Sequence, residues 1–285
     1  MTAIQDRLRH HFTVDVEEYF QVSALAPYVA RSSWESIPSR IDVGMRILLD
    51  LLAERSMRGT FFVLGWVAKY HPALVREIAA RGHEVASHGW GHERVPTLSQ
   101  QEFRDSVRDS KAALEDLAGA PVLGYRAPSF SILRGGEWAL DVLIEEGYRY
   151  DSSLVPSDRG DYGYAGGEPD PYRLVRTPGA LDEFPPATLR MGPRLQPMGG
   201  GAYFRIFPRF VERTLHACER RGVPGTFYIH PWELDPDQPA FDVPLKTRIR
   251  HYWGLSRTAE RIRRLLGEFA FQPIATTLQA ETTAG

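Results

Sequence analysis

Two acidic residues stand where the first apolar run of the chain ends. The run begins at His11, and Asp15 and Glu17 close it on the same side of an extended chain, because side chains alternate along a strand. Parallel strands of α/β enzymes present catalytic groups at such carboxyl ends. The pair could therefore belong to a catalytic site, although acidic strand ends are also common as solvated turns.

Two histidines follow another apolar run at a spacing that suits a metal. His88 and His92 enclose the sequence Gly-Trp-Gly, and imidazoles four residues apart can face one ion. With Glu17 they would form a set of two histidines and one carboxylate that leaves positions open for water. By ligand type this set suits zinc-assisted hydrolysis and non-haem iron chemistry equally. The alternative is a pair of unrelated surface histidines.

An arginine and a third histidine end two further short runs. Arg126 follows the run 122–125 and could hold a carboxylate ionised and oriented through charge-assisted hydrogen bonds. His230 follows the run 226–229, where it could serve as a general acid. Taken singly, an arginine is more often a surface ion-pair partner and such a histidine a structural residue. Their place at strand ends favours the functional interpretation.

A repeated unit must position these residues: an amphipathic helix, a charged residue with glycine, then a short apolar run. Glycine just past a helix is a stop signal, and Ser99 with Glu102 forms a capping-box start. Helices that alternate with β-branched and aromatic runs predict a largely parallel sheet, as a barrel or barrel-like α/β fold. No GxGxxG or Walker sequence supports a nucleotide-binding sheet. We expect helices over 41–55, 73–80, 99–117, 138–144 and 210–220, and strands over 11–16, 60–64, 83–87, 122–125, 148–152 and 226–229.

Two stretches break this pattern. Residues 157–201 are rich in proline, glycine and tyrosine, and we expect long loops there with one or two short strands, including Glu183-Phe184. Residues 235–255 form an irregular extension. The segment 246–264 holds seven lysines and arginines against one glutamate. This basic segment predicts either a solvated helix face or a contact with the pyrophosphate of a lipid-linked glycan or with an anionic membrane.

The composition excludes several classes of protein. The 285 residues are 43% apolar and 25% charged, which fits one barrel-sized globular domain or at most two. A net charge of −2 provides no basic field for nucleic acid. The single cysteine, Cys218, excludes an intrachain disulfide and a cysteine-cluster metal site. The sequence shows no signal peptide and no membrane-spanning run, so a cytoplasmic location is expected.

Four motifs in this order resemble those of the polysaccharide deacetylases, the NodB-homology family. They are Asp15-Val16-Glu17, His88-x3-His92, Arg126-x-Pro128 and Ile229-His230. The resemblance covers about residues 10–233 and implies a distorted (β/α) barrel of about seven strands over residues 1–234. The sequence Ser-His-Gly-Trp-Gly-His and the extension after Glu233 resemble the branch associated with bacterial exosortase and exopolysaccharide loci. In that branch residues 235–285 would be an extension of unassigned function that packs on the barrel.

The resemblance also implies roles for the residues that match the motifs. Asp15 corresponds to the catalytic base, Arg126 to the arginine that orients it, and His230 to the general acid. A divalent metal, zinc as the first expectation, would have three ligands: Glu17, His88 and His92. Such an enzyme removes N-acetyl groups from amino sugars of a polysaccharide or of a lipid-linked oligosaccharide precursor.

Further side chains near the expected rim are candidates for contact with the sugar or its acetyl group. The alternative for them is core packing, or a turn before a helix for the segment 199–205. The candidates are Trp90, Pro128, Tyr203 and Trp232. The remaining histidines are expected to be structural or on the surface: His10, His11, His71, His83, His216 and His251.

The chain departs from the family pattern in three places. Its first motif is Asp-x-Glu where many members have adjacent aspartates, and Gly89 stands where Ser or Thr is common. The Asp/Trp motif that supports the catalytic histidine is not recognisable, and Asp151, Asp182 or Glu183 could substitute for it. Relatives with altered metal motifs act on cyclic amides such as allantoin. A cyclic-amide hydrolase is therefore the alternative enzyme, and a non-catalytic glycan-binding module the alternative outside catalysis.

Overall fold

A single mostly parallel sheet forms the centre of the structure, a computed structural model that describes residues 8–158, 160 and 162–284. The strand order is β10-β1-β2-β3-β4-β5-β7-β6, and β11 also pairs with β1. All pairings are parallel except that of β6 with β7. These strands are β1 (Arg9–Val16), β2 (Thr60–Val63), β3 (Glu84–Ser87), β4 (Gly124–Tyr125), β5 (Tyr150–Asp151), β6 (Tyr172–Arg176), β7 (Gly179–Glu183), β10 (Thr226–Ile229) and β11 (Ala270–Gln272).

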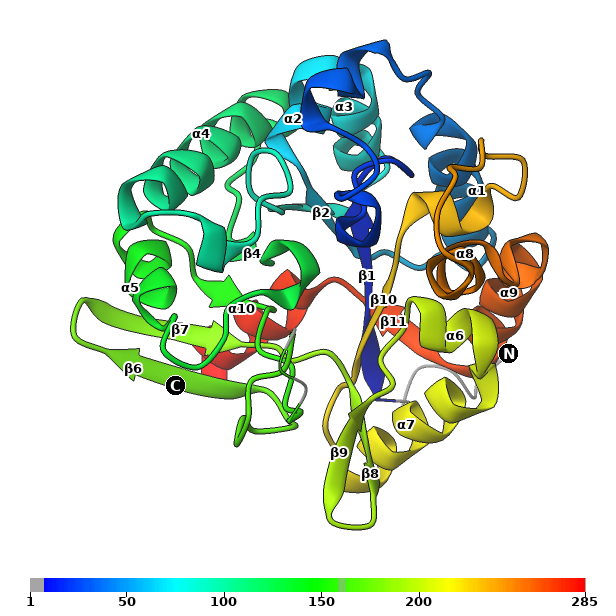
Figure 1. Cartoon of the computed structure of the whole chain (residues 1–285). Helices are drawn as coiled ribbons and strands as arrows, with labels where there is room; N and C mark the ends of the chain where they lie inside the picture. The colour runs from blue at the N-terminus through cyan, green and yellow to red at the C-terminus, as the bar shows by residue number, and fades with distance from the viewer. Residues whose placement is uncertain (1–7, 159, 161, 285) are drawn as a thin grey trace.

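Helices lie around the outside of this sheet, with β1 near the centre of the molecule (Figure 1). The longest, α4, begins with the expected capping box, in which Ser99 accepts from the Glu102 N–H and Glu102 accepts from the Ser99 N–H. The helices are α1 (Ile41–Glu54), α2 (Gly65–Tyr70), α3 (Pro72–Ala80), α4 (Gln100–Ala118), α5 (Trp138–Glu145), α6 (Ala202–Ile206), α7 (Pro208–Arg221), α8 (Leu245–Tyr252), α9 (Thr258–Glu268) and α10 (Ile274–Ala284).

The sheet curls toward closure. Single parallel bridges join Pro186 to Thr226 and Gly200 to Tyr228, so the chain after β7 meets β10 at the other end of the strand order. Seven parallel strands, β10 to β5 and β7, lie along that order within the described residues. The expected barrel-like α/β fold is confirmed, with a distorted and incompletely closed barrel.

Strand β1 shows how the sequence divides the two faces of the sheet. Phe12, Val14 and Val16 belong to the apolar core, packed with side chains of the surrounding helices. The alternate residues, Thr13 and Asp15, are also buried but bind polar partners on the other face of the strand. Alternation thus places a polar network inside the barrel and an apolar layer outside it.

The region 157–201 differs from the expectation of loops with one or two short strands. It contains four strands, because β6 and β7 form one antiparallel pair and β8 (Thr188–Met191) and β9 (Arg194–Pro197) form another. Pro178-Gly179 and Gly192-Pro193 lie at the two turns, and such dipeptides are turn signals. The extension after residue 234 contributes β11 to the central sheet beside β1. Within the described residues, no helix is long and apolar enough to cross a membrane.

Candidate active site

The six predicted catalytic and metal-binding residues come together at the carboxyl ends of four strands, which with β2 are consecutive in the sheet. Asp15 and Glu17 close β1, and the remaining four follow β3, β4 and β10. These strands bring residues more than 200 positions apart into contact, because β10 pairs directly with β1. The four that follow are His88 and His92 after β3, Arg126 after β4 and His230 after β10.

Arg126 holds Asp15 in a fixed position. Its Nη1 lies 2.7 Å from Asp15 Oδ1 and 2.8 Å from Thr13 Oγ1, while Nη2 and Nε bond to the hydroxyl and carbonyl oxygens of Ser152. The guanidinium has no exposed surface and its carbon stands 4.1 Å from the centre of the Phe62 ring. A buried cation bonded in this way orients the Asp15 carboxylate and prevents it from rotating.

Glu17, His88 and His92 form a cluster that could hold a metal ion. One ligand atom from each lies within 4.8 Å of the other two. Glu17 Oε2 is buried and stands 2.6 Å from His92 Nε2, yet it accepts no hydrogen bond of acceptable geometry from the described residues. When two such atoms lie this close without hydrogen-bond geometry, their lone pairs can both point at one metal position. The donor set therefore fits a divalent cation.

The local backbone and hydrogen bonds orient both histidines. His88 Nδ1 lies 2.8 Å from the Arg126 carbonyl oxygen, which leaves Nε2 as the ligand atom. Gly89 and His92 have φ values of +76° and +63°, so residues 88–92 form an open turn rather than the helix of many His-x3-His sites. Burial lowers the pKa of His88 to about 4, and a neutral imidazole is the form that binds metal.

His230 faces both carboxylates of β1. Its Nε2 lies 3.8 Å from Asp15 Oδ2 and 3.8 Å from Glu17 Oε1, and 18% of its side chain is exposed. Burial alone would lower its pKa, but a hydrogen bond to Glu233 and the charges of Glu17, Glu233 and Asp15 raise the pKa to about 9. At neutral pH the imidazole is therefore protonated, as a general acid must be.

Glu233 supports His230, and the sequence interpretation missed it. Glu233 Oε1 lies 2.7 Å from His230 Nδ1, and Oε2 accepts from Arg205 Nε at 2.5 Å. The three substitutes named from the sequence are wrong for this role, because other groups bind them. Asp182 pairs with Arg173, Asp151 accepts from the Ser153 hydroxyl and N–H, and Glu183 accepts from the Leu154 N–H. The available signal was the His-x-x-Glu spacing itself, which is that of a capping box at a helix start.

Trp232 connects the histidine to the metal-site carboxylate. Its Nε1 donates to Glu17 Oε1 at 3.0 Å, and its ring stacks on His230 at 5.2 Å between centroids. On the other side it stacks on His251 of α8, with ring centroids 4.3 Å apart and an interplanar angle of 15°. Trp232 is 7% exposed, so little of its ring is open to a sugar. Its contacts instead position Glu17 and His230.

Within the described residues, the other three candidates for substrate contact form no hydrogen bond with these site residues. The Trp90 ring packs against the backbone of Gly65. A Cβ added to Gly65 would lie 2.4 Å from that ring. Pro128 is buried at the start of a short 3₁₀ helix (Pro128–Phe130), and Tyr203 is half-buried in α6. Whether any of them touches substrate stays a prediction.

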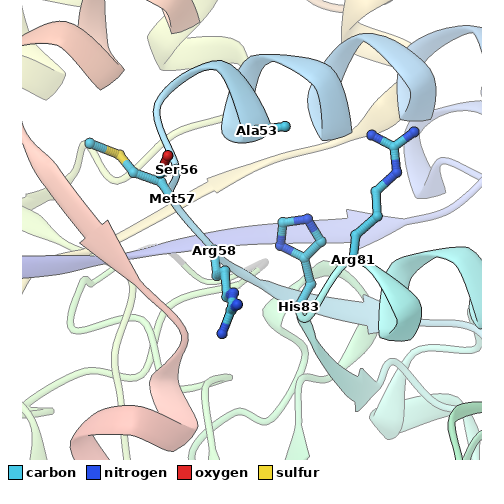
Figure 2. Close-up of a pocket in the computed structure, with 6 residues that line it drawn as sticks. All are labelled: Ala53, Ser56, Met57, Arg58, Arg81 and His83. Atoms are coloured by element: carbon cyan, nitrogen blue, oxygen red, sulfur yellow. The ribbon is translucent and has the colours of Figure 1, made fainter.

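A separate hollow of about 500 Å³ lies away from this site (Figure 2). Its lining is Ala53, Ser56, Met57, Arg58, Arg81 and His83. Arg58 precedes β2 and His83 precedes β3, so the hollow lies at the amino ends of these strands, opposite the site. The Gly59 N–H donates to His83 Nδ1, and burial together with Arg58 and Arg81 lowers the pKa of His83 to about 4. This bonding fits the structural role expected for His83.

Comparison with known proteins divides the chain into two matched regions. Residues 41–145 match the family model "Polysaccharide deacetylase", and residues 152–279 match "Domain of unknown function (DUF3473)". The first region includes His88, His92 and Arg126, whereas His230 and Glu233 lie in the second. The site is therefore assembled from both regions and from the preceding strand β1.

Curated relatives share part of this chain. A chitooligosaccharide deacetylase of Rhizobium leguminosarum bv. trifolii is 35% identical over 96 residues, which are 34% of this chain and 42% of that protein. A peptidoglycan deacetylase of Helicobacter pylori is 27% identical over 150 residues, half of each chain. The chain thus spans about half the length of the curated relatives it matches.

Solved structures share the fold over nearly the whole chain. A protein from Mycobacterium smegmatis assigned as a polysaccharide deacetylase superposes with a TM-score of 0.56 and 22% identity over 93% of both chains. A peptidoglycan deacetylase of Bacillus subtilis superposes with a TM-score of 0.50 and 14% identity over 98% of this chain and 94% of that one. Residues 41–145 thus resemble the polysaccharide deacetylase family in sequence, and nearly the whole chain shares the fold of these solved structures.

Proposed function

We propose that this chain is a metal-dependent hydrolase that removes N-acetyl groups from the amino sugars of a glycan. The observation that carries the proposal is the placement of Asp15. Its carboxylate is fixed by Arg126, lies 3.8 Å from His230 Nε2, and stands at the same strand end as Glu17, which forms a cluster with His88 and His92. The deacetylase names of the relatives and the family model support the same chemistry.

Asp15 and His230 would act as the base and the acid of this reaction. Asp15 has one oxygen bonded to Arg126 and the other free to accept a proton from the attacking water. His230 is protonated at neutral pH and partly exposed, so it can donate its own proton to the departing amine. One water is consumed, the amide C–N bond breaks, and the products are acetate and a free amino sugar.

A divalent ion held by Glu17, His88 and His92 would polarise the acetyl carbonyl and stabilise negative charge on its oxygen. The chain prepares these three side chains in advance. Trp232 fixes one oxygen of Glu17, and the carbonyl of Arg126 fixes the ring of His88. Glu17 and His88 are buried and His92 is half-buried, so little bulk water reaches them and their interaction with a cation is stronger. We propose zinc, because two imidazoles and a carboxylate with open positions suit zinc-assisted hydrolysis.

The substrate proposed is an N-acetylated polysaccharide or a lipid-linked oligosaccharide of exopolysaccharide synthesis. Contact of the segment 246–264 with an anionic membrane would favour the lipid-linked form. A cytoplasmic location stays a prediction. The relatives that are named for chitooligosaccharides and peptidoglycan support the class of N-acetylated glycans and no particular member of it.

The decisive experiment measures acetate release by the purified chain from chitooligosaccharides, peptidoglycan and an acetylated exopolysaccharide. The protein is assayed after chelation and after reloading with Zn²⁺, with elemental analysis of the same samples. We expect acetate release from at least one glycan only in the reloaded protein. Turnover of allantoin or a small imide without acetate release from any glycan would instead identify a cyclic-amide hydrolase. Undiminished glycan activity in metal-free protein would contradict the proposed mechanism.

A further inference from the structure

Helix α8 presents an exposed apolar strip. Leu245, Ile249 and Trp253 follow one another at intervals of four residues, so they lie on one side of α8 and its C-terminal cap. They are 72%, 47% and 63% exposed. Phe207, at the end of α6, is 50% exposed. Large apolar side chains gathered in this way are unusual on a monomer and indicate a surface that binds something.

The same helix carries cations beside the strip. Lys246, Arg248 and Arg250 are exposed, and among the described residues no carboxylate lies within ion-pair distance of them. Two later arginines of the basic segment are different. Arg263 pairs with Glu54 and Glu260, and Arg264 pairs with Glu212. The cations beside the strip are thus unneutralised, whereas those at the end of the segment are paired with carboxylates.

The strip is held rigidly by the opposite side of α8. His251 is 3% exposed, donates a hydrogen bond from Nε2 to Gln238 Oε1, and stacks on Trp232. At the end of the helix, the carbonyl oxygens of Arg250 and Trp253 accept from the buried Arg205 guanidinium at 2.7 and 2.5 Å. Arg205 belongs to α6, which lies close to α8 (Figure 1). The exposure of the strip is therefore not the fraying of a loose helix.

A bilayer with anionic headgroups fits both the apolar strip and the cations beside it. Aliphatic and tryptophan side chains enter the boundary between headgroups and acyl chains, and flanking lysines and arginines attract anionic lipid. A helix of this length buries too little apolar surface for permanent insertion, so binding would be reversible and sensitive to salt. An acidic protein would satisfy the cations but would leave the aliphatic strip without a matching partner.

We propose that α8 docks this chain on anionic phospholipid bilayers through Leu245, Ile249 and Trp253, with Lys246, Arg248 and Arg250 at the headgroups. His251 of the same helix stacks on Trp232, which in turn stacks on His230, so docking would hold the site close to the membrane surface. A glycan carried on a membrane lipid would then lie within reach of the site. That last consequence rests on the proposed deacetylase function, whereas the docking does not.

The test is co-sedimentation of the full chain with vesicles of phosphatidylglycerol and phosphatidylcholine, and with vesicles of phosphatidylcholine alone. We expect binding to the first kind only, weakened by added salt. The triple variant Lys246→Gln/Arg248→Gln/Arg250→Gln should reduce partitioning on the order of 100-fold at low salt, about fivefold for each cation. The double variant Ile249→Ser/Trp253→Ser should also reduce it, because the apolar contribution is lost while the charge is kept.

The β8–β9 hairpin offers a matched control. There Arg190 and Arg194 flank Met191, which is 45% exposed, so the hairpin combines exposed cations with an apolar side chain. The variant Arg190→Gln/Met191→Ser/Arg194→Gln should bind vesicles as the native chain does. Circular dichroism and hydrolysis of a soluble acetylated glycan should be unchanged in every variant, which separates a docking defect from loss of the fold or of the proposed activity.

Three results would overturn the docking proposal. They are absence of native binding to the anionic vesicles, native-like binding by both α8 variants, and an equal loss in the hairpin control. If sedimentation velocity shows a native dimer that only the α8 variants dissociate, while vesicle binding is absent, the strip is a contact between copies of the chain instead.

Discussion

Glu233 Oε1 lies 2.7 Å from Nδ1 of His230, the residue three positions before it, and the other Glu233 oxygen is held by Arg205. This contact leaves Nε2 of His230 directed toward Asp15 and Glu17. A buried carboxylate behind the imidazole fixes both the ring orientation and its charge. Glu233 is itself kept ionised, because Arg205 and His230 outweigh the effect of burial and lower its pKa.

Replacing Glu233 with Gln should slow acetate release and move its pH dependence. The amide keeps the shape of the carboxylate but removes a negative charge that raises the His230 pKa to about 9. Since the acid must be protonated, the alkaline limb of kcat/KM should fall near pH 9 in the native chain and at lower pH in the variant. We expect a decrease in kcat of about 100-fold, within the range of general acid catalysis.

The pair His216 and Glu219 provides the control for this substitution. It has the same spacing and a contact of 2.8 Å, but its side chains are partly exposed and lie outside the site. Glu219→Gln should leave both the rate and the pH profile unchanged. Equal effects of the two variants, or an unmoved alkaline limb in Glu233→Gln, would exclude Glu233 as the group that tunes His230.

The same raised pKa predicts how stability depends on pH. A histidine whose pKa rises from 6.5 in the unfolded chain to about 9 in the folded chain contributes its full stabilisation below pH 6.5. That contribution is lost as pH rises from 6.5 through 9. Urea unfolding of the metal-free native chain should therefore give a decreasing midpoint over this window, and His230→Gln should flatten the decrease.

Much of this site could be predicted from local sequence, because strand ends and alternation are local properties. Asp15 and Glu17 share one side of β1 for that reason, and the four-residue spacing of His88 and His92 is visible without a structure. Arg205 and His251 could not be found in this way. Each meets the site through a contact with residues 231–234 that no periodicity announces.

The region 157–201 contains more strands than the one or two expected, and the physical reason for this difference is another one. β6 is alternately half-buried and exposed, and β8 and β9 are short with a single buried residue each. Their stability comes from pairing with a neighbour rather than from burial of an apolar run. Turn residues at Pro178-Gly179 and Gly192-Pro193 were the signal that could have revealed both hairpins.

Asp15→Asn and His88→Ala should separate catalysis from metal binding. The asparagine variant removes the base but none of the three ligand candidates, so we expect normal metal content with activity reduced about 1,000-fold. The alanine variant removes a ligand and should lose both metal and activity. Elemental analysis of dialysed samples gives the first quantity and acetate release the second. Metal retained at native stoichiometry by His88→Ala would show that the ion binds elsewhere.

Arg126→Met should destabilise the fold strongly. The guanidinium and Asp15 are both buried, and removal of one partner leaves a buried charge without compensation, which costs about 3–5 kcal/mol. Urea unfolding of the metal-free protein measures the loss. In an Asp15→Asn background the same substitution should cost less, because no carboxylate is left unpaired. Arg108→Met, at an exposed arginine paired with Asp105 and Asp109, should cause no measurable change.

Gly44→Ala tests how closely α1 is fitted to the chain beside His230. A Cβ on Gly44 would lie 1.8 Å from the carbonyl oxygen of Pro231, and backbone at that distance must move. Although alanine improves helix propensity by about 1 kcal/mol, we expect net destabilisation of about 1–3 kcal/mol from the overlap. The displaced Pro231 adjoins His230, so kcat should fall as well. Gly267→Ala in α9, where the nearest atom is 3.6 Å away, should be neutral or stabilising. Unfolding midpoints and acetate release measured on both variants decide the point, because an unaffected Gly44→Ala protein would mean that α1 does not fix the position of the catalytic histidine.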